Sequence, residues 1–68
     1  MREVSEKEFY RPIFDKGLDV HPTIVSGFPY TSEWRFPRQI GTPLYGKTVD
    51  RVEGGRIRTS YFIAESSK

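Results

Sequence analysis

Residues 44 to 64 constrain the fold of this 68-residue chain more than any other stretch. The segment reads LYGKTVDRV, then EGG, then RIRTSYFIA, so two runs rich in β-branched and aromatic residues flank a Gly-Gly pair. Such runs are typical of strands, and Gly-Gly between them is typical of a β-hairpin turn. We therefore predict a long hairpin here and expect the rest of the chain to pack against it.

The length of the hairpin loop decides which side chains share a face, because a slip of one residue turns a strand over. A two-residue loop, Gly54-Gly55, would place Val52 opposite Ile57 and would spread the apolar side chains over both faces. A three-residue loop that includes Glu53 would gather them on one face, namely Tyr45, Val49, Ile57, Tyr61 and Ile63. We predict the three-residue loop, with one glycine in the left-handed conformation at a bulge.

The N-terminal segment carries the signals of a short helix. Ser5 and Glu8 form the S-x-x-E pattern of a capping box, which satisfies free backbone N–H groups at a helix start. Apolar residues at positions 9, 10, 13 and 14 would lie on one face. Pro12 removes a helical hydrogen bond, so we expect either a helix that ends near residue 11 before a further turn, or a kink. Gly17 is the predicted stop.

Further strands are predicted in the middle of the chain. Residues 30 to 36 alternate between two sets of side chains, which is typical of a half-buried strand, and Trp34 is predicted to be the centre of the core. Residues 23 to 25 would form a short edge strand. Pro37 ends the longer strand because it has no N–H to donate. The polar residues 65 to 68 are predicted to form a frayed tail.

These elements predict one domain over residues 1 to 68. Its class is α+β, with a short N-terminal helix packed on a three- to four-stranded antiparallel sheet. A small SH3-like half-barrel is the alternative, since short twisted strands and glycines suit tight closure. The side chains predicted to form the core are Phe9, Ile13, Phe14, Trp34, Phe36, Val49, Ile57, Tyr61 and Ile63.

The size and composition of the chain bear on its partners. A domain of about 60 residues buries only about 60% of its unfolded surface. This chain has no cysteine for a disulfide and a single histidine, and aromatic residues make up 15% of it. Because aromatic side chains dominate both cores and interfaces, we expect a homodimer or a protein partner. No apolar run has membrane-spanning length and no signal-peptide pattern is present, so we expect a cytoplasmic protein without membrane contact.

One stretch matches a chemical motif. Residues 41 to 48, GTPLYGKT, fit the phosphate-binding P-loop G-x-x-x-x-G-K-[ST], in which Lys47 would contact phosphates and Thr48 a magnesium ion. A P-loop follows a buried strand and begins a helix. Here Gly54-Gly55 follows too soon for a helix of ordinary length, and the flanking residues are typical of strands. We interpret the match as accidental and predict no cofactor.

Asp19 and His21 are the next candidates for chemistry. They would lie on one side of an extended segment, but a metal site needs three or four ligands and no cluster of carboxylates or imidazoles is apparent nearby. We interpret His21 as a turn residue hydrogen-bonded by Asp19. Neither Ser26 nor Ser60 has an identifiable base, so we predict no catalytic residue and no enzyme activity.

Basic residues cluster in and beside the predicted sheet, while acidic residues concentrate in the N-terminal third. With tyrosine and tryptophan between them, they show the pattern by which many small modules bind nucleic acid, although the net charge is only +2. Our leading prediction is a non-catalytic protein-interaction module that self-associates. The alternative is a weak nucleic-acid-binding module. Its candidate binding residues are Arg35, Arg38, Lys47, Arg51, Arg56 and Arg58.

Five short stretches spread over the chain carry a resemblance: S-E-K-E-F, D-V-H-P, F-P-Y-T-S-E-W, Y-G-K-T-V and Y-F-I-A-E. Together they resemble short uncharacterised bacterial proteins that consist of one domain of unknown function. The resemblance implies a bacterial or mobile-element origin. It implies no activity and no site residues.

Overall fold

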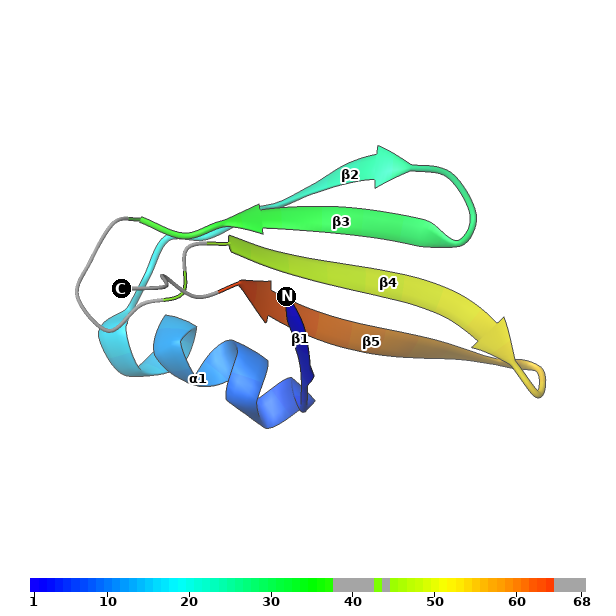
Figure 1. Ribbon diagram of the computed structural model, residues 1–68, viewed down its shortest axis with the longest axis horizontal. Helices are drawn as coiled ribbons and strands as arrows, with labels where there is room; N and C mark the ends of the chain where they lie inside the picture. The colour runs from blue at the N-terminus through cyan, green and yellow to red at the C-terminus, as the bar shows by residue number, and fades with distance from the viewer. Residues whose placement is uncertain (38–42, 44, 65–68) are drawn as a thin grey trace.

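The computed structural model describes residues 1–37, 43 and 45–64. Within them lie β1 (Arg2–Val4), α1 (Glu6–Lys16), β2 (Pro22–Ser26), β3 (Tyr30–Arg35), β4 (Tyr45–Glu53) and β5 (Arg56–Ala64). All five strands pair antiparallel in one sheet, in the spatial order β1-β5-β4-β3-β2 (Figure 1).

The α+β class is confirmed, and the sheet has five strands in the described residues where three or four were predicted. Strand β1 is the addition, because a run of only three residues is too short to show a periodic pattern. In the described residues the sheet is open, with β1 and β2 at its edges. The predicted tail, residues 65 to 68, lies outside the described residues.

Helix α1 begins and ends where its capping residues predict. The backbone N–H of Glu8 donates a hydrogen bond of 3.1 Å to Ser5 Oγ, and Gly17 adopts the left-handed conformation at the other end, with φ of 60°. The helix continues through Pro12 to Lys16, so the shorter of the two predicted helices is wrong. Proline frees only the carbonyl four residues earlier, and Glu8 is exposed, so water can satisfy that group.

The core forms around Phe9, whose side chain is fully buried, and not around Trp34, which is only partly buried. Four other rings surround it, with centroids 5.2 to 6.2 Å from its own: Tyr10, Trp34, Phe36 and Tyr61. Val4 and Ile63 are buried beside it, and Val4 was missing from the predicted core. Most of these rings meet edge to face, the arrangement that aromatic pairs favour.

Gly46 allows aromatic rings of the core to pack closely on the sheet. A Cβ atom at this position would lie 2.8 Å from Phe9 Cε1 and 3.0 Å from Phe36 Cε1. No residue other than glycine leaves room for both rings. The ring of Phe9 therefore packs directly on the backbone of β4 at Gly46.

The hairpin of β4 and β5 has the two-residue loop, so the predicted three-residue loop is wrong. Val52 pairs with Ile57 and Glu53 pairs with Arg56, which leaves only Gly54 and Gly55 in the turn. Both glycines have positive φ, of 58° and 78°. Two such residues give the type I′ turn, whose twist matches that of the flanking strands.

Three residues of the predicted core lie outside it, two of them because of this register. Val49 is half-buried but belongs to the sheet face opposite the buried Thr48. Ile57 is 73% exposed, and Phe14, on the outer side of α1, is 77% exposed. The core occupies only one end of the hairpin, so a register chosen to align apolar residues along its whole length was misleading.

Candidate functional site

The register divides the sheet into two faces with different chemistry. We call the face packed against α1 the helix face. Along β4 it carries Gly46, Thr48 and Asp50, and Gly46 lies against the core at the end of the sheet that α1 covers. The other, called the open face, carries the alternate residues of β4, which include Lys47 and Arg51. In Figure 1 both hairpin turns lie at the end of the sheet away from α1.

Five of the six predicted nucleic-acid-binding residues share the open face. Lys47 and Arg51 lie on β4, and the cross-strand pairs place the others on the same side: Arg35 opposite Tyr45, Arg56 opposite Glu53 and Arg58 opposite Arg51. Arg38 lies outside the described residues. The structure thus brings the described cations to one surface, and their role in binding stays a prediction.

Near the covered end of the sheet, acidic side chains offset the cations of the open face. Glu33 pairs across the strands with Lys47, and Glu3 pairs with Phe62. Partial burial, and then a hydrogen bond to Glu33, raise the pKa of Tyr45 above its usual value of 10.0. Positive and negative groups alternate here, so this part of the open face has little net charge.

Residues 51 to 58, which we call the distal ribbon, differ from the rest of the sheet. Strand β3 pairs with β4 only as far as Asp50, and β1 pairs with β5 only from Tyr61 onward. Among the described strands, none therefore lies beside the distal ribbon on either side, and its turn reaches beyond that of β2 and β3 (Figure 1). Every one of its residues is exposed.

The charges of the distal ribbon are unbalanced. It carries Arg51, Arg56 and Arg58 against a single acid, Glu53, which approaches Arg58 at 3.7 Å. Arg51 lies directly opposite Arg58 across the two strands, an arrangement that destabilises a sheet. The Glu53–Arg58 ion pair is exposed and therefore weak. This end of the open face thus carries the unneutralised positive charge.

On the helix face, two hydrogen-bonded pairs of polar side chains lie at the edge of the core. Thr48 is buried, and its Oγ1 accepts a hydrogen bond of 3.0 Å from the indole Nε1 of Trp34. One step further along the hairpin, the hydroxyl of Thr59 donates to Asp50 Oδ1 at 2.7 Å. Beyond these pairs the aromatic core gives way to an uncovered surface.

That uncovered surface is apolar. We call it the apolar shelf; the register places its side chains on the helix face, and all are exposed: Ile24, Tyr30, Val52 and Ile57. Phe28, in the turn before β3, packs edge to face on Tyr30 with ring centroids 5.7 Å apart. Sequence analysis missed the shelf because it assigned Ile57 to the core. The Gly-Gly turn was the signal that could have placed Val52 beside it.

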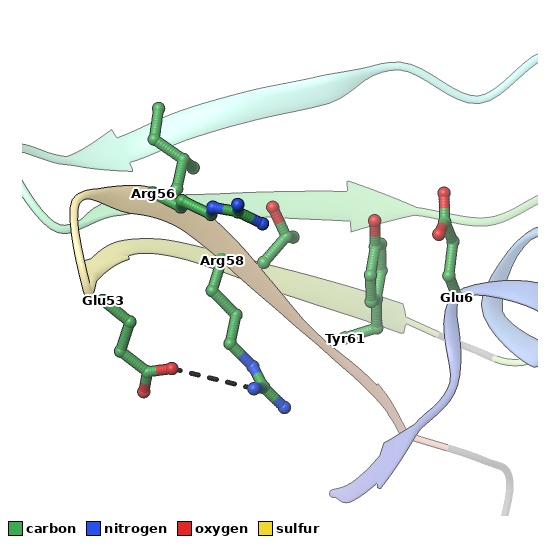
Figure 2. A pocket seen from close by; sticks show the side chains of 7 residues that line it. Glu6, Glu53, Arg56, Arg58 and Tyr61 are labelled. Carbon is green, nitrogen blue, oxygen red and sulfur yellow. Dashed lines mark ion pairs between the residues drawn. The ribbon is translucent and has the colours of Figure 1, made fainter.

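A shallow groove of about 510 Å³ runs along β5 between the start of α1 and the distal ribbon. Glu6 and Tyr61 lie at one end and Glu53 and Arg58 at the other (Figure 2). Burial, then the neighbouring Tyr10 and Glu6, raise the pKa of Tyr61 above its usual value of 10.0. The groove is lined by no histidine, cysteine or serine, and the hydroxyl of Thr59 in its lining donates a hydrogen bond to Asp50.

The described residues of the P-loop match form a strand, as expected if the match is accidental. Lys47 and Thr48 are consecutive residues of strand β4, so their side chains lie on opposite faces of the sheet. The hydroxyl of Thr48 accepts a hydrogen bond from the indole of Trp34, and the packing of Phe9 accounts for glycine at position 46. The first residues of the motif, 41 and 42, lie outside the described part of the chain.

His21 and Asp19 meet as predicted, with Nε2 and Oδ1 2.7 Å apart and both side chains highly exposed. Among the described residues, no group of three or more potential ligands comes together to hold a metal ion. Likewise, α1 is too short and too polar to cross a membrane, and it is the one helix in the described segments.

Comparison with known proteins yields no match to a protein-family model, to a curated protein or to a solved structure. The resemblance to short bacterial single-domain proteins therefore stays a prediction. Inference about function has to come from the two surfaces described above, the apolar shelf and the distal ribbon.

Proposed function

We propose that this protein is a non-catalytic interaction module that forms a homodimer through the apolar shelf. The observation that carries the proposal is the bare end of the helix face, where Ile24, Tyr30, Val52 and Ile57 are exposed together. Contiguous apolar surface of this kind marks sites of association in soluble proteins.

The dimensions of the chain support a partner on this surface. Its radius of gyration is 12.4 Å, whereas a compact chain of this length has about 11 Å. Its accessible surface is 5084 Å², and a folded monomer of the same mass exposes about 4,400 Å² on the usual scaling. The chain is thus more extended than a compact monomer of the same mass, as expected if part of its surface packs against a partner.

A second copy suits the shelf better than a charged partner. The four shelf residues are uncharged, and Asp50, which lies among them opposite Tyr30, accepts a hydrogen bond from the hydroxyl of Thr59. A two-fold axis sets the same patch against itself, so an apolar surface meets an apolar surface. The aromatic pair Phe28 and Tyr30 adds large side chains of the kind that dominate interfaces.

Association through the face is also favoured over association through the edge. Strand β2 is an edge strand, but it begins with Pro22 and its pairing with β3 shifts register between Ile24 and Ser26. A proline and a bulge both hinder the addition of another strand. Face-to-face packing of two shelves needs neither of the free edges.

The test is sedimentation equilibrium of the full chain and of two matched variants. Ile57→Lys places a charge in the shelf, and we expect the dimer dissociation constant to rise at least about tenfold, since each buried isoleucine contributes about 1.5–3 kcal/mol. Phe14→Lys is the control, because Phe14 is equally exposed but lies on α1.

Two results would contradict the proposal. One is a wild-type chain that stays monomeric at high micromolar concentration. The other is a Phe14→Lys variant that dissociates as readily as Ile57→Lys, which would move the interface to the outer side of α1. Circular dichroism of both variants checks that the fold is retained, as expected for substitutions at exposed positions.

A further inference from the structure

We infer that the distal ribbon is a contact site for B-form duplex DNA, with its arginines on the sugar–phosphate backbone. The inference concerns the open face and goes beyond the proposed homodimer, which uses the helix face. It also narrows the predicted nucleic-acid surface from the whole open face to residues 51 to 58.

The shape of the ribbon suits a DNA groove. Three residues of each strand project past β3, which at about 3.4 Å per residue gives a projection of about 10 Å. The major groove of B-form DNA is about 12 Å wide and about 8.5 Å deep, and it admits a two-stranded β-ribbon. No described strand pairs with the outer sides of residues 51 to 58, and their turn reaches beyond the turn of β2 and β3, so the tip of the ribbon can approach such a groove (Figure 1).

The charges of the ribbon suit phosphate. Neither Arg51 nor Arg56 has an acidic partner within hydrogen-bonding distance among the described residues, and Arg58 has only the weak, exposed contact with Glu53. The guanidinium group binds phosphate through paired hydrogen bonds. Arg51 and Arg58 repel each other across the strands in the free protein. A phosphate between them would attract both guanidinium groups and offset that repulsion.

Duplex DNA fits the ribbon better than other nucleic acids do. Single-stranded nucleic acid is held by bases stacked on aromatic side chains, and the distal ribbon contains none. The aromatic residues of the open face, Tyr45 and Phe62, lie near the covered end beside Glu33 and Glu3. Duplex RNA has a deep and narrow major groove that side chains cannot enter.

The experiment measures fluorescence anisotropy of a labelled 20-base-pair DNA duplex with the full chain over a series of salt concentrations. The double variant Arg51→Gln/Arg58→Gln should bind at least about tenfold more weakly at low salt, and its salt slope should fall by about one per arginine removed in each protomer. Lys7→Gln/Arg11→Gln is the matched control, because it removes the same charge from exposed positions on α1 and should leave the slope unchanged.

Three probes of similar charge decide the ligand class. Tighter binding of a single-stranded oligonucleotide, equal binding of an RNA duplex, or binding of phosphatidylserine vesicles without binding of the DNA duplex would each overturn the inference. So would an equal loss of affinity in the α1 control. Supporting results are tightest binding to duplex DNA and amide shifts confined to residues 51 to 58.

Sedimentation of the arginine double variant separates this inference from the proposed homodimer. Arg51 and Arg58 lie on the open face, so their removal should leave the dimer intact while DNA binding is lost. A wild-type monomer that binds duplex DNA would contradict the homodimer alone. A dimer that binds no duplex at low salt would contradict the DNA inference alone.

Discussion

The two ends of the sheet differ sharply, although β4 and β5 run through both. At the covered end, Gly46 and Ile63 pack under Phe9 and are buried. At the distal end, Val52 and Ile57 face the same way and are exposed. The register continues without interruption from one end to the other, so the difference lies in what packs on top and in which strands lie alongside.

This contrast separates the part of the molecule that stabilises the fold from the part available for contacts. Helix α1 and β1 both meet β5 at its C-terminal end, so the described buried apolar side chains are concentrated there. The distal ribbon is held by its own hydrogen bonds and its turn. Substitutions at the covered end should therefore change stability, and those at the distal end should change association.

The largest expected effect is that of Phe9→Ala. Removal of a fully buried phenylalanine costs about 3–5 kcal/mol, which approaches the whole stability of many small domains. Urea denaturation followed by the fluorescence of Trp34 should show a variant that is largely unfolded. Ile57→Ala, measured in dilute protein, should change stability by less than about 0.5 kcal/mol. Equal losses for the two variants would remove the distinction between the two ends.

An intermediate effect is expected for Gly46→Ala. The added methyl group would press on both Phe9 and Phe36, and overpacking of this kind costs about 1–3 kcal/mol. Gly27→Ala is the control, because a Cβ atom there meets nothing within 4 Å. The difference between their urea midpoints measures how tightly the ring rests on β4. A harmless Gly46→Ala variant would show that the core can shift.

The smallest effect has the opposite sign. Arg51→Thr removes the like-charge pair with Arg58 and places a good strand former in β4, so stability should rise by up to about 1 kcal/mol. Arg35→Thr is the control, since Arg35 faces Tyr45 and not a cation. Added salt should shrink the gain by screening the repulsion. A gain that is independent of salt would mean that the charges do not interact.

Local signals predicted much of the fold. Ser5 and Gly17 marked the two ends of α1, and the alternation around Trp34 marked β3, because caps and strand periodicity depend on residues close together in sequence. Strand β1 was missed since its existence depends on Tyr61, far along the chain. The loop length was wrong for a related reason: the apolar pattern was assumed to follow one core along the whole hairpin.

The candidate surfaces were predicted less well than the fold. The clustering of arginines followed from the sequence, because alternate residues of a hairpin share a face. The exposure of Ile57 and the lack of a strand beside Arg51 did not follow from the sequence, since both depend on where β3 and α1 end along the sheet. Those end points are properties of tertiary packing that single-sequence patterns do not contain.

Strand β1 has a consequence for the order of folding. It comes first among the described elements, yet it pairs with residues 61 to 63 of β5, the last of the described strands. The entropy lost in closing a loop grows with its length, and contacts between distant residues form slowly. Val4 therefore cannot be buried until β5 has formed. We expect partly synthesised chains to remain unfolded until the whole sheet forms in one cooperative step.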